Sequence, residues 1–96
     1  MKMVVIVCPE GRREEFRDSI EDHGIHAYTE LRHAMGEGET GKKFASQIWP
    51  GESVIIFMVI DDGKKAEVVE LVRHCQAKLY AAEGMRAFVM PVEETL

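Results

Sequence analysis

Hydrophobic and β-branched residues gather in four short segments that have the patterns typical of β-strands. These segments are residues 2–7, 25–32, 53–60 and 86–92. The first and third, KMVVIV and SVIIFMVI, are almost continuously apolar, which is typical of strands that are covered on both faces. The second alternates, with one face formed by Ile25, Ala27, Thr29 and Leu31 and the other by His26, Tyr28, Glu30 and Arg32. This alternation predicts a half-exposed strand.

Two segments between these strands have apolar residues at helical spacing. Residues 10–23 are strongly charged and carry Phe16 and Ile20 one turn apart. Gly24 follows directly, and glycine is the residue type that most often ends a helix. Residues 64–79 carry a more regular apolar stripe, formed by Val68, Val72, Cys75 and Leu79. An Asp-Asp-Gly turn precedes this second helix and offers a carboxylate for its N-terminal cap.

The elements follow each other in the order β-α-β-β-α-β. This order predicts an α+β, ferredoxin-like fold, with an antiparallel four-stranded sheet of strand order 4-1-3-2 and two helices on one face. The two most apolar strands then lie at the centre of the sheet, as their composition requires. We expect one domain over residues 1–96, with a long loop at residues 34–51. Loops of this length are usually functional or disordered.

The charge balance is acidic, because 12 Lys and Arg residues stand against 17 Asp and Glu residues and give a formal net charge of −5. This balance argues against a nucleic-acid partner, which requires a basic surface. No apolar run reaches the ~18–20 residues that cross a bilayer, and the N-terminus lacks a signal-peptide pattern. We therefore expect a cytoplasmic protein in which Cys8 and Cys75 are reduced and buried.

The loop at residues 34–51 contains two near-matches to phosphate-binding motifs. Gly36-Glu-Gly38-Glu-Thr-Gly41 is a literal GxGxxG, but no apolar helix pattern follows it and 96 residues cannot hold a full dinucleotide fold. GEGETGKK nearly matches the Walker A pattern, but Lys43 stands where a hydroxyl should bind magnesium. Two interpretations stay open: backbone amides with Lys42 and Lys43 that bind an anion, or a flexible loop with solvated charges.

The histidines and cysteines show no metal-binding spacing. No CxxC or HxxxH pattern is formed by His23, His26, His33, His74, Cys8 or Cys75. A metal site within one chain is therefore not expected, whereas a site shared between subunits stays open. No nucleophile–base pair or carboxylate dyad can be assigned, so we predict no catalytic residue.

Three local patterns accompany the predicted layout: the helix entry CPEGRREEFRDSIEDHGI, the long loop between the second and third strands, and the ending AFVMPVEE. Together they resemble the PII-like signalling family, and the chain looks like a divergent member of it. The helix entry is similar to the family's Pro-Glu, charged helix and Gly-Ile element. The loop at residues 34–51 stands at the position of the family's T-loop, and the ending is similar to the family's closing strand.

The resemblance implies a homotrimer that senses a small effector, such as an adenine nucleotide or another anion, in clefts between subunits. The loop then changes shape and regulates a partner, for example a membrane transporter or an enzyme, so the protein itself is expected not to be an enzyme. The resemblance and the loop motifs together suggest a set of ligand-binding residues. These are Gly36, Gly38, Thr40, Gly41, Lys42, Lys43, Gly84 and Arg86.

The sequence departs from the family in one place that bears on the ligand. The stretch Glu83-Gly84-Met85-Arg86 stands where classical members carry a Gly-Asp-Gly-Lys phosphate loop, so Arg86 matches the family's lysine approximately. Another nucleotide, a small anion or a metal then fits as the ligand. Two alternatives stay open: a metal-binding sensor that uses His33 across an interface, and a small ferredoxin-like enzyme or amino-acid-binding module.

Overall fold

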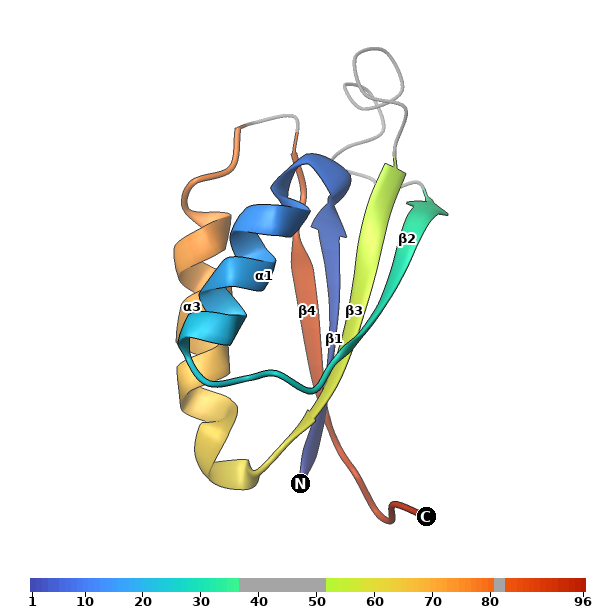
Figure 1. Cartoon of the computed structure of the whole chain (residues 1–96), viewed down its shortest axis with the longest axis vertical. Coiled ribbons are helices and arrows are strands. Elements are labelled where there is room, and N and C mark those ends of the chain that lie inside the picture. Colours follow the sequence, from blue (N-terminus) through green and yellow to red (C-terminus); the bar gives the residue numbers. More distant parts are fainter. Residues whose placement is uncertain (37–51, 81–82) are drawn as a thin grey trace.

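The computed structural model describes residues 1–36, 52–80 and 83–96, which form a four-stranded antiparallel sheet with two helices on one face (Figure 1). The strands are β1 (Lys2–Pro9), β2 (Thr29–Met35), β3 (Glu52–Ile60) and β4 (Arg86–Pro91). The helices are α1 (Arg13–Asp22) and α3 (Lys65–Gln76), which follow the 3-10 turns η1 (Glu10–Arg12) and η2 (Asp62–Lys64). The strand order β2-β3-β1-β4 confirms the predicted ferredoxin-like order, with the first and third strands at the centre.

The hydrophobic core lies between the sheet and the helices. Every second residue of β1 and β3 is buried there, because successive side chains of a strand point to opposite faces. The buried strand residues are Val4, Ile6, Cys8, Val54, Ile56, Met58 and Ile60. The helices add Phe16, Ile20, Val68 and Val72 from the predicted apolar stripes, together with Leu71; Cys75 and Leu79 of the predicted stripe are only partly buried. Both helices therefore bury their stripes against the same face of the sheet.

The end of α1 forms as the sequence predicts. Gly24 has φ +80°, a left-handed conformation that glycine adopts without steric cost. The Gly24 amide donates to the Glu21 carbonyl at 3.0 Å, and the Ile25 amide donates to the Ile20 carbonyl at 3.0 Å. These two bonds make a Schellman motif, which satisfies the last carbonyls of the helix and turns the chain so that Ile25 is buried.

Strand β2 differs from its prediction in both position and orientation. It spans Thr29–Met35 instead of residues 25–32, because the chain leaving α1 first crosses the end of the core. Tyr28 packs against the core, whereas Leu31, on the predicted apolar face, is 52% exposed. The register shifts between Leu31 and Ala34, where His33 has φ 60°. Polar contacts of Tyr28 and Glu30 with α1 therefore set the orientation of this strand.

The cap predicted for the second helix is wrong. Neither η2 nor α3 has a side-chain hydrogen bond at its N-terminus. The Asp62 carboxylate instead pairs with the N-terminal ammonium of Met1 at 2.9 Å. This ion pair lowers the pKa of the Asp62 carboxyl and joins the start of β1 to the turn that follows β3.

The face of the sheet opposite the helices is also apolar. Residues paired directly across antiparallel strands lie on the same face. Three rows of paired residues cross the sheet on this side: Met90–Met3–Val59, Phe88–Val5–Phe57–Thr29 and Arg86–Val7–Ile55–Leu31. Several of these side chains stay in contact with water, and Phe88 is 54% exposed. We call the surface formed by these three rows the open face.

Candidate functional site

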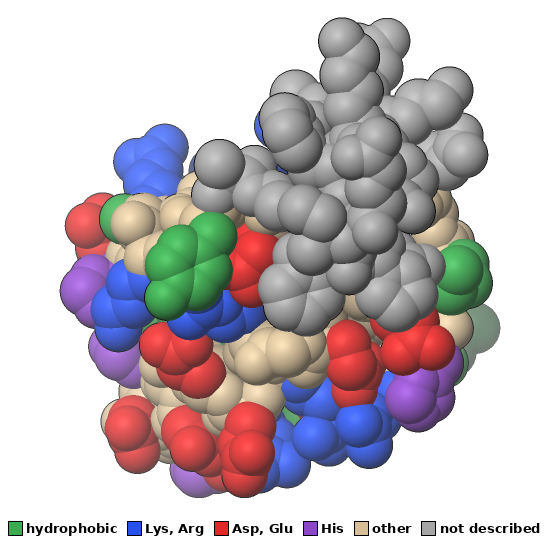
Figure 2. Space-filling model, turned by 90° about the horizontal axis from the view of Figure 1, so that it is seen from above, with side chains coloured by type: hydrophobic (Ala, Val, Ile, Leu, Met, Phe, Trp, Pro, Cys, Tyr) green, Lys and Arg blue, Asp and Glu red, His purple; other side chains and the backbone are tan. Residues whose placement is uncertain are grey.

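Four parts of the chain meet at one end of the sheet, where β1 and β2 end and β3 and β4 begin (Figure 1). Pairing fixes this geometry, because Pro9 is opposite Ser53 and Val7 is opposite Arg86. Turn η1 and the connection from α3 to β4 lie at the same end. Figure 2 looks onto it and shows Asp and Glu side chains among Lys, Arg and His side chains.

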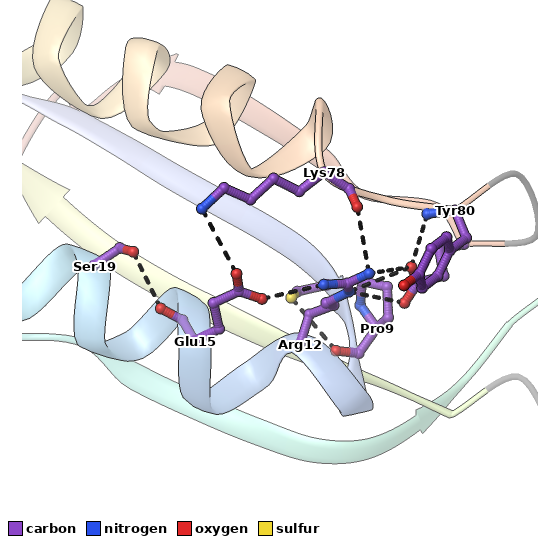
Figure 3. Close-up of polar contacts among 8 residues, drawn as sticks. Pro9, Arg12, Glu15, Ser19, Lys78 and Tyr80 are labelled. Atoms are coloured by element: carbon purple, nitrogen blue, oxygen red, sulfur yellow. Dashed lines mark hydrogen bonds and ion pairs between the residues drawn. The ribbon is translucent and has the colours of Figure 1, made fainter.

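Arg12 of η1 is the centre of a polar cluster at this end (Figure 3). Its guanidinium donates to both Glu83 carboxylate oxygens at 2.9–3.3 Å, and to Glu15 at 3.3 Å. It also donates to the Lys78 carbonyl at 3.4 Å and lies 5.2 Å from the centre of the Tyr80 ring. The cluster therefore ties η1 to the connection between α3 and β4.

The Glu83 carboxylate serves two donors. It accepts the Arg12 hydrogen bonds, and it also accepts one from the Tyr80 backbone amide at 2.9 Å. The Arg12 hydrogen bonds and the Tyr80 amide lower the pKa of the Glu83 carboxyl below its ordinary value, against a smaller opposing effect of burial. Glu83 is thus ionised at neutral pH and holds the residues just before Gly84 in place.

A second group of ion pairs lies where β2 meets the helices. Arg13 of α1 donates to Glu30 of β2 at 2.8 Å, and Arg32 of β2 donates to Glu10 of η1 at 2.8 Å. The hydrogen bond from Arg32 lowers the pKa of the Glu10 carboxyl. One carboxylate oxygen each of Glu10 and Glu30 is buried without a hydrogen-bond partner among residues 1–36, 52–80 and 83–96. Each of these carboxylates therefore has acceptor capacity that its arginine leaves unused.

The structure describes three of the eight predicted ligand-binding residues. Gly36 follows β2, Gly84 precedes β4, and Arg86 is the first residue of β4; all three are exposed. A Cβ placed on Gly36 or Gly84 would meet no atom of the described part of the chain within 4 Å beyond the chain neighbours. The other five lie outside the described residues: Gly38, Thr40, Gly41, Lys42 and Lys43.

Gly36 and Arg86 share one end of the sheet but lie at its opposite edges. Strands β3 and β1 separate β2 from β4, so the two residues are three strand spacings apart, or about 14 Å. Arg86 belongs to a row of the open face, in line with Val7 and Ile55. Its guanidinium therefore lies beside the apolar surface that the helices leave uncovered.

A small cavity of about 10 Å³ lies beneath the Arg12 cluster. Its lining comes from η1, α1, α3, the end of β1 and the connection to β4. The lining residues are Cys8, Arg12, Glu15, Phe16, Cys75, Leu79 and Met85. Cys8 is buried as predicted, and so is Met85, whereas Cys75 is only half-buried; neither cysteine is in a disulfide among the described residues.

Histidine, cysteine and carboxylate side chains form no group of three or more at metal-binding distance within residues 1–36, 52–80 and 83–96. Among the described residues, a carboxylate oxygen of Glu52 lies 3.4 Å from the His33 ring nitrogen, and His33 also contributes to the lowered pKa of the Glu10 carboxyl. A metal site that His33 shares with another subunit stays a prediction. No helix in these ranges is long and apolar enough to span a bilayer.

Sequence reasoning missed the contacts that dominate this end of the molecule. Arg12 meets Glu83 across 71 positions of the chain, and Cys8 and Cys75 line one cavity from two different elements. Sequence motifs relate residues that are close along the chain, and these partners share no local spacing. The only sequence pattern that pointed to this cavity was the helix periodicity, which placed Cys75 on the inner face of α3.

Comparisons with known proteins agree with this architecture. The family model described as nitrogen regulatory protein P-II matches residues 1–96. Among solved structures, the chain is similar to a PII-like signalling protein from Thermus thermophilus, with a TM-score of 0.61 and 20% sequence identity. That match covers 93% of this chain and 83% of the other, and it supports the fold. A comparison with curated proteins gives no match.

Proposed function

Because the chain belongs to the nitrogen regulatory protein P-II family, we propose that it is a signalling regulator that acts as a homotrimer and senses a small anionic ligand between its subunits. The open face carries this proposal. It offers an apolar surface that spans four strands, and it ends at Arg86. Monomeric proteins rarely leave such a surface in water, whereas subunit interfaces use one.

Self-association through the open face follows from its chemistry. Complete burial of an apolar side chain contributes roughly 1.5–3 kcal/mol, and Phe88 and Leu31, which are already half buried, would gain about half of that in a subunit interface. The paired rows place such side chains side by side across the sheet, so that several can be buried together. A small domain with a limited core gains stability from this association.

The ligand site is best placed between two subunits. Within one chain, the sheet keeps Gly36 and Arg86 at opposite edges. If open faces meet, Arg86 lies at the rim of the contact, where the T-loop residues of a neighbouring subunit can approach it. Gly84 adds an exposed backbone that a ligand can approach, because a Cβ placed on it would meet no described atom within 4 Å beyond its chain neighbours.

An anion suits this set of residues. Arg86 offers a planar guanidinium that forms two parallel hydrogen bonds to a phosphate, and the predicted loop residues Lys42 and Lys43 would add positive charge. An adenine nucleotide is the candidate that the family resemblance suggests, and another nucleotide or a small anion is the alternative that the altered loop at Glu83-Gly84-Met85-Arg86 favours. The ligand would change the conformation of the loop at residues 34–51, which then regulates a partner such as a membrane transporter or an enzyme. We propose that the protein acts in the cytoplasm and that the chain itself catalyses no reaction.

Native mass spectrometry and calorimetry test the proposal together. The purified protein is expected at a mass near three chains, and ATP or ADP is expected to bind in a calorimetric titration. Arg86→Ala should weaken that binding by roughly 10–100-fold, since a hydrogen bond to a charged group contributes about 1.5–3 kcal/mol. Arg73→Ala, at an exposed position of α3, is the matched control.

Two results would contradict the proposal. A monomer at every concentration would remove the intersubunit site. Unchanged nucleotide affinity in Arg86→Ala, or an equal loss in Arg73→Ala, would show that Arg86 does not bind the ligand.

A further inference from the structure

Three sulfur-bearing side chains from separate parts of the fold line the cavity beneath Arg12. Cys8 comes from the end of β1, Cys75 from the last turn of α3, and Met85 from the residues just before β4. Cys8 is fully buried and Met85 is 6% exposed. The fold thus brings three residues with polarisable sulfur atoms to one cavity of about 10 Å³. This volume is close to the smallest that can hold one water molecule.

The two thiols also influence each other electrostatically. Burial raises the pKa of Cys8 to about 12, and the nearby Cys75 contributes to the increase. Both residues line the same cavity, which is consistent with this electrostatic influence. Both remain free thiols, so neither is committed to a disulfide. The cavity is therefore lined by two available thiols and one thioether.

We propose that Cys8, Cys75 and Met85 form a binding site for a soft monovalent metal ion, copper(I) or its analogue silver(I). Thiolates and thioethers are the ligands that select copper(I), whereas magnesium and calcium require oxygen ligands. A structural zinc site takes four nitrogen or sulfur ligands, and the described residues offer no group of three or more histidines, cysteines and carboxylates. The donor set and the size of the cavity both favour one small, soft cation.

The atoms and charges of the binding reaction balance without any electron transfer. The metal enters as a monovalent ion, two S–H bonds break, two metal–thiolate bonds form, and two protons leave to solvent. The product carries one net negative charge. Burial and the nearby Glu10 and Glu83 carboxylates raise the pKa of Cys8, and the Arg12 guanidinium, which lines the same cavity, opposes them by lowering it.

This proton release predicts that the affinity rises with pH. Below the pKa values of both thiols, mass action increases the apparent binding constant by about a hundredfold per pH unit. The charged groups around the thiols are Glu10, Arg12, Glu15, Lys78 and Glu83. The pKa values of the Glu10 and Glu83 carboxyls are lowered and that of the Arg12 guanidinium is raised, so these three groups keep their charge between about pH 6 and pH 8.

The test uses the reduced full chain without oxygen. Copper(I) is supplied as its complex with a chromogenic chelator such as bicinchoninate, and the protein is titrated in. We expect the protein to remove one copper ion per chain from the chelator, with native mass spectrometry showing one ion bound for two protons lost. Silver(I) should give the same stoichiometry. Since silver(I) cannot be oxidised under these conditions, its binding does not depend on oxidation of the metal.

Two variants and two controls identify the ligands. Cys75→Ser should weaken copper(I) binding by about a hundredfold or more, and Met85→Leu by about tenfold. Met90→Leu removes a thioether from the open face, and His74→Ala removes the imidazole next to Cys75; both should bind as the natural sequence does. Cys75 is half-buried, so its serine variant is expected to fold, and circular dichroism checks this for all four proteins.

Three outcomes would overturn the proposal. The first is that the protein takes no copper(I) from the chelator. The second is unchanged copper(I) binding by Cys75→Ser, and the third is a loss of affinity in Met90→Leu as large as that in Met85→Leu. None of these results bears on the nucleotide titration of Arg86→Ala, so the metal site and the proposed regulatory function fail or stand separately.

Discussion

The two faces of the sheet are both apolar but meet different surroundings. On the covered face, Ile6 and Ile56 are fully buried under α1 and α3. On the open face, their neighbours Val5 and Phe57 pair in the next row, and this row ends at Phe88, which is half exposed. The strands alternate between these faces residue by residue. The same segments therefore build the core of one chain and, in our proposal, the interface with another.

This comparison explains why β1 and β3 lack the polar alternation of a half-exposed strand. A strand with one face in water normally carries polar residues on that face. Here both faces are apolar, which is typical of a sheet that is covered on both sides. One chain covers only one side over the described residues, so the composition of these strands favours a second protein surface on the other.

The largest effect on folding is expected on the covered face. Ile56→Ala removes a fully buried side chain and leaves a cavity, which should cost about 2–5 kcal/mol of unfolding free energy. Val59→Ala, three residues along the same strand on the open face, is the control and should cost well under half as much in the monomer. Urea unfolding at low protein concentration measures both. Equal losses would show that the two faces do not differ in the isolated chain.

The largest effect on assembly is expected on the open face. Phe88→Glu places a charge in the middle row, which should dissociate the proposed trimer, because an unpaired charge is costly to bury in an interface. Native mass spectrometry should show the mass of a single chain with unchanged circular dichroism. Leu96→Glu adds the same charge at another exposed apolar residue and should leave the trimer intact. Loss of folded structure in Phe88→Glu would show instead that this face stabilises the single chain.

The sequence was sufficient for the topology because the central strands and both helices carry strong periodic patterns. It placed Phe16, Ile20 and Val68 in the core correctly, and it identified Gly24 as the end of α1. It failed for β2, where tertiary contacts override the local pattern. Leu31 alternates with polar residues as a core residue would, yet the hydrogen bonds of Glu30 with α1 turn Leu31 toward the open face.

The candidate site could be predicted only in part. Arg86 and Gly84 were found because a family resemblance pointed to the residues before the last strand. The partner of Arg12 could not be found, since Glu83 is 71 positions away and nothing in the local sequence distinguishes it from other acidic residues. The same holds for the cavity residues Cys8 and Met85, which come together only when the chain folds.

A smaller loss of stability is expected for Glu83→Gln, because the contacts of Glu83 lie on the helix-covered side of the sheet. This change weakens the hydrogen bonds from Arg12 and should lower the melting temperature by a few degrees at pH 7, with the trimer mass unchanged. The pKa of Glu83 is lowered in the folded protein from an ordinary value of 4.5, so its stabilising effect is present above pH 4.5 and is lost as the pH falls through the lowered value. The difference in melting temperature between the two proteins should therefore shrink below pH 4.5.

The control for this change is Glu14→Gln, at a highly exposed position of α1. It removes one carboxylate charge without touching the Arg12 cluster, so it should leave the melting temperature unchanged at either pH. Dissociation of the trimer in Glu83→Gln would contradict the separation between the two faces, because it would make the Arg12 cluster part of the interface.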